Sequence, residues 1–146
     1  RVINYITGPF ALQHDVDIIS DKEISIFNNN NINTFRGDMN LSNSEVVIYN
    51  FENNQFSQKF ANSMAENNVI TETQGLSDIL KDGSLMVEEQ NYGRILFFNS
   101  EGKLEWEFIN KADNNKIYHV TWGRIIDDIK LINNIKEKIQ NTTCSN

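Results

Sequence analysis

Two stretches of the chain are similar in sequence, and together they decide the fold. Residues 13–26 have the sequence QHDVDIISDKEISI, and residues 74–87 have the sequence QGLSDILKDGSLMV. A repeated stretch indicates a repeated structural unit, and a residue found in both copies is a candidate for a structural role. Asp17 and Asp78 occupy equivalent places. We therefore expect each carboxylate to accept hydrogen bonds from backbone N–H groups of its own unit.

The second half of the unit is repeated as well. Residues 44–50 (SEVVIYN) match residues 93–99 (GRILFFN) at a shorter offset, which places an insertion at residues 28–43. Residues 103–109 (KLEWEFI) alternate between polar and apolar, which is typical of a half-exposed outer strand. Each unit is thus predicted to hold four strands. Their hairpin turns are expected at Asp21-Lys22, Asn53-Asn54, Asp82-Gly83 and Glu101-Gly102.

Four-stranded units repeated around an axis are the blades of a β-propeller. We predict an all-β chain in which residues 1–126 form part of a propeller. It comprises two four-stranded antiparallel blades, at about residues 13–62 and 74–110, and a closing strand near residues 119–126. Residues 2–6 are expected to end a preceding blade. Two blades leave edge strands unpaired, so we expect further blades, or another copy of the chain, to complete the ring.

Residues 127–146 are predicted to form a short helix and tail. Ile129, Ile132, Ile135 and Ile139 recur at helical spacing, which indicates an amphipathic helix over residues 127–140. One apolar face on a short helix usually serves the core, so a cap packed on the rim of the sheet is favoured over a helix that binds a partner.

Composition excludes several classes of protein. The net charge of −7 disfavours binding to nucleic acid. No apolar run is long enough to span a bilayer. Cys144 is the single cysteine, so the chain has no internal disulfide. We predict no metal site and no cofactor.

His14 is the candidate functional residue that the repeat singles out. Its counterpart is Gly75, so a unit can be built without a histidine there. The alternative for His14 is a non-catalytic one, because the first strand of a propeller blade often ends in a polar residue that bonds a neighbouring blade. Side chains alternate along a strand, so neither Asp15 nor Asp17 is expected to share a face with His14. His119 lies in an apolar stretch, without a cysteine or acidic neighbour at ligand spacing. A packed, structural histidine is therefore favoured there.

Three arginines are candidates for stabilising negative charge. Arg124 lies in the expected closing strand and could either reach the propeller axis or pair with a carboxylate, and the structural role is favoured. Arg94 lies on a third strand and is expected to face solvent. Arg36 lies in the insertion and could fold over a site.

Several motifs resemble the arylsulfotransferase family of propellers. They are residues 10–16 (FALQHDV), 24–30 (ISIFNNN), 102–108 (GKLEWEF) and 121–126 (TWGRII). The family's Phe-Asp-Asn-Gly segment is replaced here by residues 27–30 (FNNN), which removes a carboxylate and a glycine.

The resemblance implies a six-bladed propeller that transfers a sulfuryl group from a phenolic sulfate ester to a phenol through a sulfated histidine. His14 matches the nucleophile, and Arg124 is the weaker candidate for substrate binding. The family's remaining catalytic histidines and arginine would come from other blades. The resemblance also implies a periplasmic or secreted protein. The alternative is a non-enzymatic propeller segment that binds a ligand or a protein partner.

Overall fold

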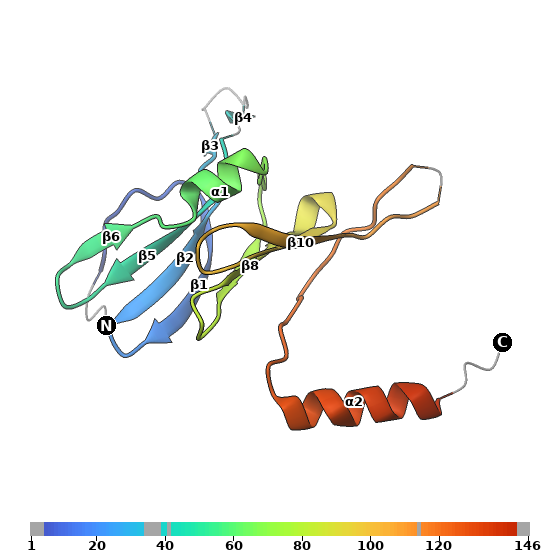
Figure 1. The fold of residues 1–146 in the computed structure, drawn as a ribbon. Coiled ribbons are helices and arrows are strands. Elements are labelled where there is room, and N and C mark those ends of the chain that lie inside the picture. The colour runs from blue at the N-terminus through green and yellow to red at the C-terminus, as the bar shows by residue number, and fades with distance from the viewer. Residues whose placement is uncertain (1–4, 34–38, 41, 114, 143–146) are drawn as a thin grey trace.

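The computed structural model describes residues 5–33, 39–40, 42–113 and 115–142. Two four-stranded antiparallel sheets and a C-terminal helix are its main elements (Figure 1). The chain is mostly β, and both four-stranded sheets match the sequence prediction. No closed ring of sheets is present in the described part of the chain.

The first sheet has the strand order β1-β2-β5-β6. Its strands are β1 (Gln13–Ser20), β2 (Glu23–Asn28), β5 (Glu45–Asn50) and β6 (Gln55–Ser57). The expected insertion between β2 and β5 contains a short hairpin of β3 (Ile32–Asn33) and β4 (Met39–Asn40).

The second sheet has the order β10-β9-β8-β7, which is again the order of the strands along the chain. Its strands are β7 (Leu76–Ile79), β8 (Leu85–Glu89), β9 (Arg94–Phe98) and β10 (Leu104–Ile109). A 3-10 turn, η1 (Gln90–Tyr92), joins β8 to β9. Gly83 and Gly102 adopt left-handed φ angles of 81° and 84°, so the two glycine turns expected in this sheet are confirmed.

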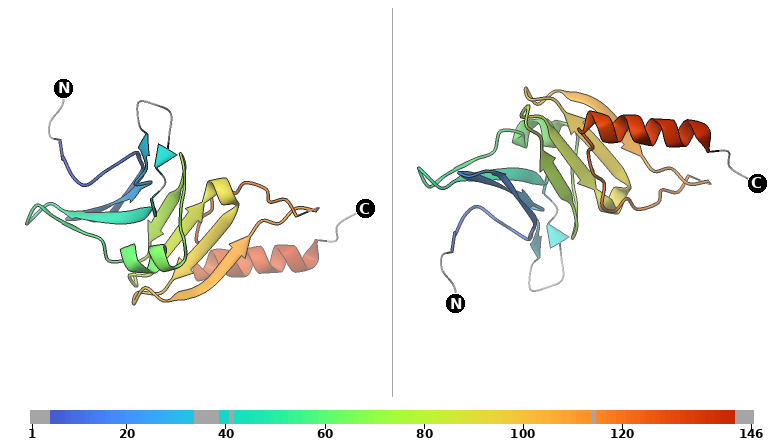
Figure 2. Two further views of the ribbon diagram at one scale, coloured as in Figure 1. Left: turned by 90° about the horizontal axis from the view of Figure 1, so that it is seen from above. Right: turned by 90° about the horizontal axis from the view of Figure 1, so that it is seen from below.

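The core lies between the two sheets. Phe27 and Val46 of the first sheet meet Leu85, Val87, Leu96 and Phe98 of the second. Helix α1 (Ala61–Glu66) follows the first sheet and adds Met64 to this cluster. Figure 2 shows the two sheets inclined to each other with α1 at their junction. The apolar strand faces found in the sequence therefore bury each other.

The predicted closing strand is wrong. Residues 119–126 form no strand, and two of their backbone donors are used elsewhere. The Glu88 carboxylate accepts the N–H groups of both Trp122 and Gly123. Of the expected end of a preceding blade, residues 2–4 lie outside the described residues, and Tyr5 and Ile6 are not in a strand.

The C-terminal helix is confirmed, but its expected packing is not. Helix α2 (Ile129–Asn141) begins after Asp128, whose carboxylate caps it by accepting the N–H groups of Lys130 and Leu131. None of its described residues is buried. Figure 1 shows α2 apart from both sheets, beyond an extended segment. Helical spacing reveals an apolar face but not what covers it.

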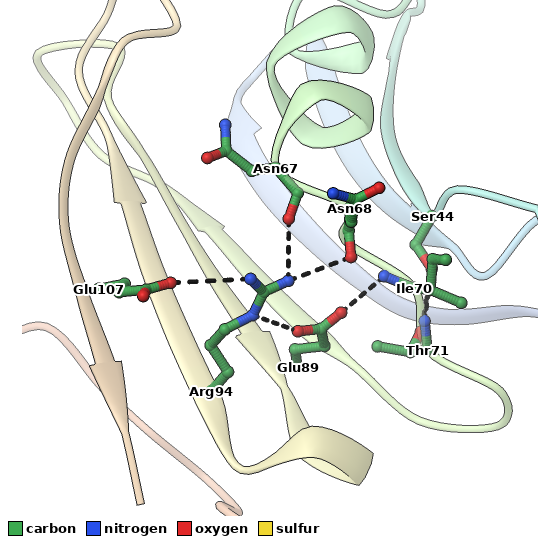
Figure 3. Close-up of polar contacts among 8 residues, drawn as sticks. All are labelled: Ser44, Asn67, Asn68, Ile70, Thr71, Glu89, Arg94 and Glu107. Atoms are coloured by element: carbon green, nitrogen blue, oxygen red, sulfur yellow. Dashed lines mark hydrogen bonds and ion pairs between the residues drawn. The ribbon is translucent and has the colours of Figure 1, made fainter.

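The linker between the sheets, residues 67–75 between α1 and β7, is held from both sides, as Figure 3 shows. On the first sheet's side, the Ser44 hydroxyl accepts the N–H of Thr71 at 2.9 Å. On the other, Glu89 accepts the N–H of Ile70 at 2.6 Å and pairs with Nε of Arg94 at 2.5 Å. Arg94 also donates to the carbonyl oxygens of Asn67 and Asn68, each at 3.1 Å. Arg94 is therefore largely buried, and its expected solvent-facing position is wrong.

The first sheet has an equivalent arrangement. Asn28 and Glu45 are directly opposite across β2 and β5, as Glu89 and Arg94 are across β8 and β9. The Asn28 side chain donates to Glu45 at 3.0 Å and accepts the N–H of Ala11 at 2.9 Å. Asparagine can donate and accept at once, so Asn28 holds the chain that enters the first sheet without a carboxylate.

Arg94→Met is expected to lower the free energy of unfolding by about 3–5 kcal/mol, because it leaves the buried Glu89 charge unpaired. Lys22→Met is the matched control, since it breaks the exposed pair of Lys22 and Glu52 and should cost at most about 1 kcal/mol. Urea denaturation measures both. Equal losses would show that the Glu89–Arg94 pair is not what holds the linker.

Candidate functional site

The first strands of the two sheets lie side by side, and His14 is at the point of contact. Nδ1 of His14 lies 3.1 Å from the carbonyl oxygen of Gly75, its counterpart in the other sequence copy. One residue further on, the Asp15 carboxylate accepts the N–H of Ser77 at 3.1 Å. These two bonds join β1 to the start of β7.

A β-bulge changes which side chains share a face of β1. Gln13 is opposite Asn28, but Asp15 is opposite Phe27, so His14 has no partner of its own in β2. A bulge interrupts the alternation of side chains. His14 and Asp15 consequently line the same cavity, and the expectation that they occupy opposite faces is wrong.

The cavity beside His14 has a volume of about 390 Å³. Residues from the second unit and from the segment that follows β10 complete it. Its lining residues are His14, Asp15, Gln74, Leu76, Gln90, Thr121, Trp122 and Arg124. The structure therefore brings together His14 and Arg124, the two site residues that the sequence suggested.

A smaller cavity of about 110 Å³ adjoins the first and is acidic. Asp15, Asp17 and Asp78 line it together with Arg124. Burial raises the pKa of the Asp17 carboxyl above its ordinary value, and the negative charges of Asp15 and Asp78 raise it further. Arg124 acts in the opposite direction. The guanidinium group thus balances part of a concentrated negative charge.

The expected role of the two shared aspartates is not what the structure shows. Among the described residues, no backbone N–H donates to the Asp17 or Asp78 carboxylate. Because β1 and β7 lie side by side, these equivalent residues instead face the same cavity. The two carboxylates repel each other across the contact between the units, whereas a hydrogen bond inside each unit was expected.

Gly75 is not simply a position that tolerates a small residue. A Cβ atom at residue 75 would lie 2.7 Å from Cζ of Phe27, which is fully buried in the core. Glycine is needed here because the Phe27 ring occupies the space of a side chain. The difference between His14 and Gly75 therefore reflects packing on the Gly75 side.

Two other candidates do not belong to this site. His119 is exposed and lies outside any strand, so the expected packed histidine is wrong. Its carbonyl oxygen accepts a hydrogen bond from the side chain of Asn110. Arg36 lies outside the described residues.

Sequence reasoning missed Glu88. Its side chain is fully buried and accepts hydrogen bonds from Gln90 at 2.9 Å, from the N–H of Trp122 at 3.0 Å and from that of Gly123. These bonds fix the segment that carries Arg124 against the second sheet. A polar residue inside an otherwise apolar strand (LMVEE) is the signal that could have pointed to it.

The His14 contact determines which ring nitrogen is available for chemistry. A carbonyl oxygen can only accept, so Nδ1 donates its hydrogen to Gly75 and the lone pair of the neutral ring lies on Nε2. A histidine with a fixed tautomer and a free Nε2 can act as a nucleophile or as a general base. Arg124 is the one charged donor among the residues lining the same cavity.

No group of three His, Cys, Asp or Glu side chains within residues 5–33, 39–40, 42–113 and 115–142 is arranged to hold a metal ion. In the same residues, no helix is both long enough and apolar enough to cross a membrane.

Comparison with models of known families matches residues 2–111 to the arylsulfotransferase (ASST) family. The match includes His14 and both sheets, and it ends before Arg124. Searches of curated proteins and of solved structures find no match.

Asp17→Asn is expected to stabilise the protein at neutral pH. A raised carboxyl pKa means that the folded state favours protonated Asp17 more than the unfolded state does. The stability that protonated Asp17 contributes is fully present below the ordinary pKa of 3.8 and is lost as the pH rises and the carboxylate ionises. The gain in the free energy of unfolding should therefore be present at pH 7 and disappear below about pH 3.8. Denaturation at several pH values, with Asp21→Asn in the exposed turn as control, measures it. A gain independent of pH would contradict the repulsive cluster.

Proposed function

Because the chain belongs to the arylsulfotransferase family, we propose that it transfers a sulfuryl group from an aryl sulfate to a phenol, with His14 as the nucleophile. The observation that carries the proposal is the contact of His14 Nδ1 with the Gly75 carbonyl oxygen. It leaves the lone pair on Nε2, which is the state that a nucleophilic imidazole requires.

The proposed reaction has two steps. In the first, Nε2 of His14 attacks sulfur, the bond between sulfur and the aryl oxygen breaks, and the phenolate leaves with the electron pair. The positive charge that develops on the sulfated ring is shared with Nδ1–H, which donates to Gly75. In the second, the oxygen of an acceptor phenol attacks sulfur, and the bond between sulfur and Nε2 breaks with its electron pair returning to Nε2. The phenol proton passes to solvent, and neutral His14 is restored.

The charges at the site define what else the reaction needs. An aryl sulfate is an anion, and Asp15, Asp17 and Asp78 outnumber Arg124 around the two cavities. A sulfuryl group in transfer carries negative charge on its oxygens and needs converging donors. We propose that further blades supply these donors, with the two sheets as neighbouring blades of a propeller around an axis beside β1 and β7.

His14→Ala should reduce sulfuryl transfer from 4-nitrophenyl sulfate to a phenol by at least about a thousandfold, because the covalent step is lost. The transfer assay uses the natural form of the protein. Mass spectrometry of the same protein treated with donor alone should show an acid-labile sulfate on His14. His119→Ala is the matched control and should change the rate less than about twofold, since that side chain is exposed and outside the cavity.

Two outcomes would contradict this assignment. Transfer that survives in the His14→Ala variant would remove the nucleophile from the proposal. A natural protein that forms no sulfated histidine and transfers no sulfate would favour the alternative, a propeller segment that only binds a ligand or a protein partner.

The propeller proposal predicts association through the exposed apolar faces of the sheets. Val16 and Ile18 on β1 and Phe108 on β10 are exposed, so residues 1–146 are expected to associate with further blades or with another copy. Ile18→Glu should shift sedimentation velocity toward the monomer, whereas Glu66→Lys at the exposed end of α1 should not. A compact, cooperatively folding monomer of the parent chain would refute the prediction.

A further inference from the structure

Trp122 has a conformation that needs an explanation. Its φ angle is 62°, in the left-handed region that bulky side chains avoid. The side chain is also 74% exposed, so it does not adopt this conformation to fill the core. Strained residues of this kind persist only where the surrounding structure imposes them, and they concentrate at functional sites.

Glu88 imposes the conformation of Trp122. Its buried carboxylate accepts the N–H of Trp122 at 3.0 Å and that of Gly123 next to it. A Cβ atom at residue 123 would lie 2.6 Å from Oε2 of Glu88, so the glycine allows the close approach. Among the described residues no lysine or arginine pairs with Glu88, so its charge is balanced by hydrogen-bond donors.

The held segment presents an aromatic ring and a cation to the cavity of His14. The guanidinium carbon of Arg124 lies 5.3 Å from the centroid of the Trp122 ring, and Arg124 donates to the carbonyl oxygen of Gly123 at 2.8 Å. Both side chains line the 390 Å³ cavity together with His14. Residues 121–124 lie outside the strands, and the pairing of β8 with β9 is continuous.

We propose that Trp122 binds the aromatic ring of the ligand, that Arg124 binds its anionic oxygen, and that Glu88 is the positioning residue for both. A flat ring gains contact area and offset stacking on the indole. The anion must point toward Arg124, because the carboxylates of Asp15, Asp17 and Asp78 repel it elsewhere. An aromatic anion fits this site, and an aliphatic sulfate lacks the part that Trp122 holds.

This proposal rests on the proposed function only in identifying the ring as that of an aryl sulfate, since ring binding does not require transfer. Equilibrium dialysis of the His14→Ala variant with 4-nitrophenyl sulfate measures binding without turnover. In that background, Trp122→Ala should weaken binding by about tenfold. Trp122→Phe should restore most of it, and methyl sulfate should bind weakly to all variants.

Glu88→Gln tests the positioning role, with Glu89→Gln as the matched control. Both residues are buried neighbours on β8, and each holds the N–H of a distant segment, Glu88 at Trp122 and Glu89 at Ile70. Both substitutions lower stability, which thermal unfolding measures. Only Glu88→Gln is expected to weaken dialysis binding of 4-nitrophenyl sulfate by about tenfold and to raise its KM in the His14 protein.

The outcomes separate this proposal from the proposed function. If binding depends on Trp122 and Glu88 while the protein that retains His14 transfers no sulfate, the ring site is supported and the transferase is rejected. Transfer with a KM unchanged by Trp122→Ala would do the reverse. Equal effects of Glu88→Gln and Glu89→Gln would overturn the positioning role, and absence of binding to the His14→Ala protein would overturn the ring site.

Discussion

The close contact between the Phe27 ring and the backbone at Gly75 is the constraint on which the rest of the structure depends. Phe27 is fully buried between the sheets, and residue 75 can approach its ring only without a side chain. That approach brings the start of β7 beside β1, where Nδ1 of His14 reaches the Gly75 carbonyl oxygen. Packing in the core thus determines the tautomer of the candidate nucleophile, because the partner of Nδ1 is a backbone atom that the packing positions.

Two adjacent glutamates do different work at the end of β8. Side chains alternate across a strand, so Glu88 and Glu89 point to opposite faces of the second sheet. Glu89 faces the linker and pairs with Arg94, whereas Glu88 faces residues 122–123 and is balanced by N–H donors. A buried carboxylate is stable only when its oxygens are satisfied. The second sheet therefore anchors the linker before it through Glu89 and the segment after it through Glu88.

The sequence predicted those features that local patterns determine. Alternation and turn residues placed both four-stranded sheets, and Gly83 and Gly102 confirmed the second sheet's turns. Predictions of features that depend on contacts between distant residues were wrong. The apolar pattern of residues 119–126 resembles a strand, but these residues form none, and Glu88 accepts the N–H groups of Trp122 and Gly123. The division into residues 1–126 and 127–146 stays a prediction.

The candidate site divides in the same way. The difference between the two sequence copies singled out His14, and the position in the expected closing strand made Arg124 a candidate, but neither could show that both line one cavity. The bulge at His14 made the prediction that His14 and Asp15 lie on opposite faces wrong, because a bulge depends on the register with the partner strand. Asp17 and Asp78 were predicted as partners of the backbone, since a repeat identifies equivalent places without showing that those places meet.

The repulsion between the shared aspartates has a consequence for the site. Unpaired negative charge beside a nucleophile disfavours an anionic substrate, and the folded protein keeps it there although the pKa of Asp17 is raised. Arg124 alone balances part of that charge within the described cavities. A cation that is already shared with carboxylates attracts an anion less strongly than a free one. On our proposals, binding draws on the aromatic surface of Trp122 and on donors from further blades, and the His14 cavity then selects ligands that combine a ring with an anionic group.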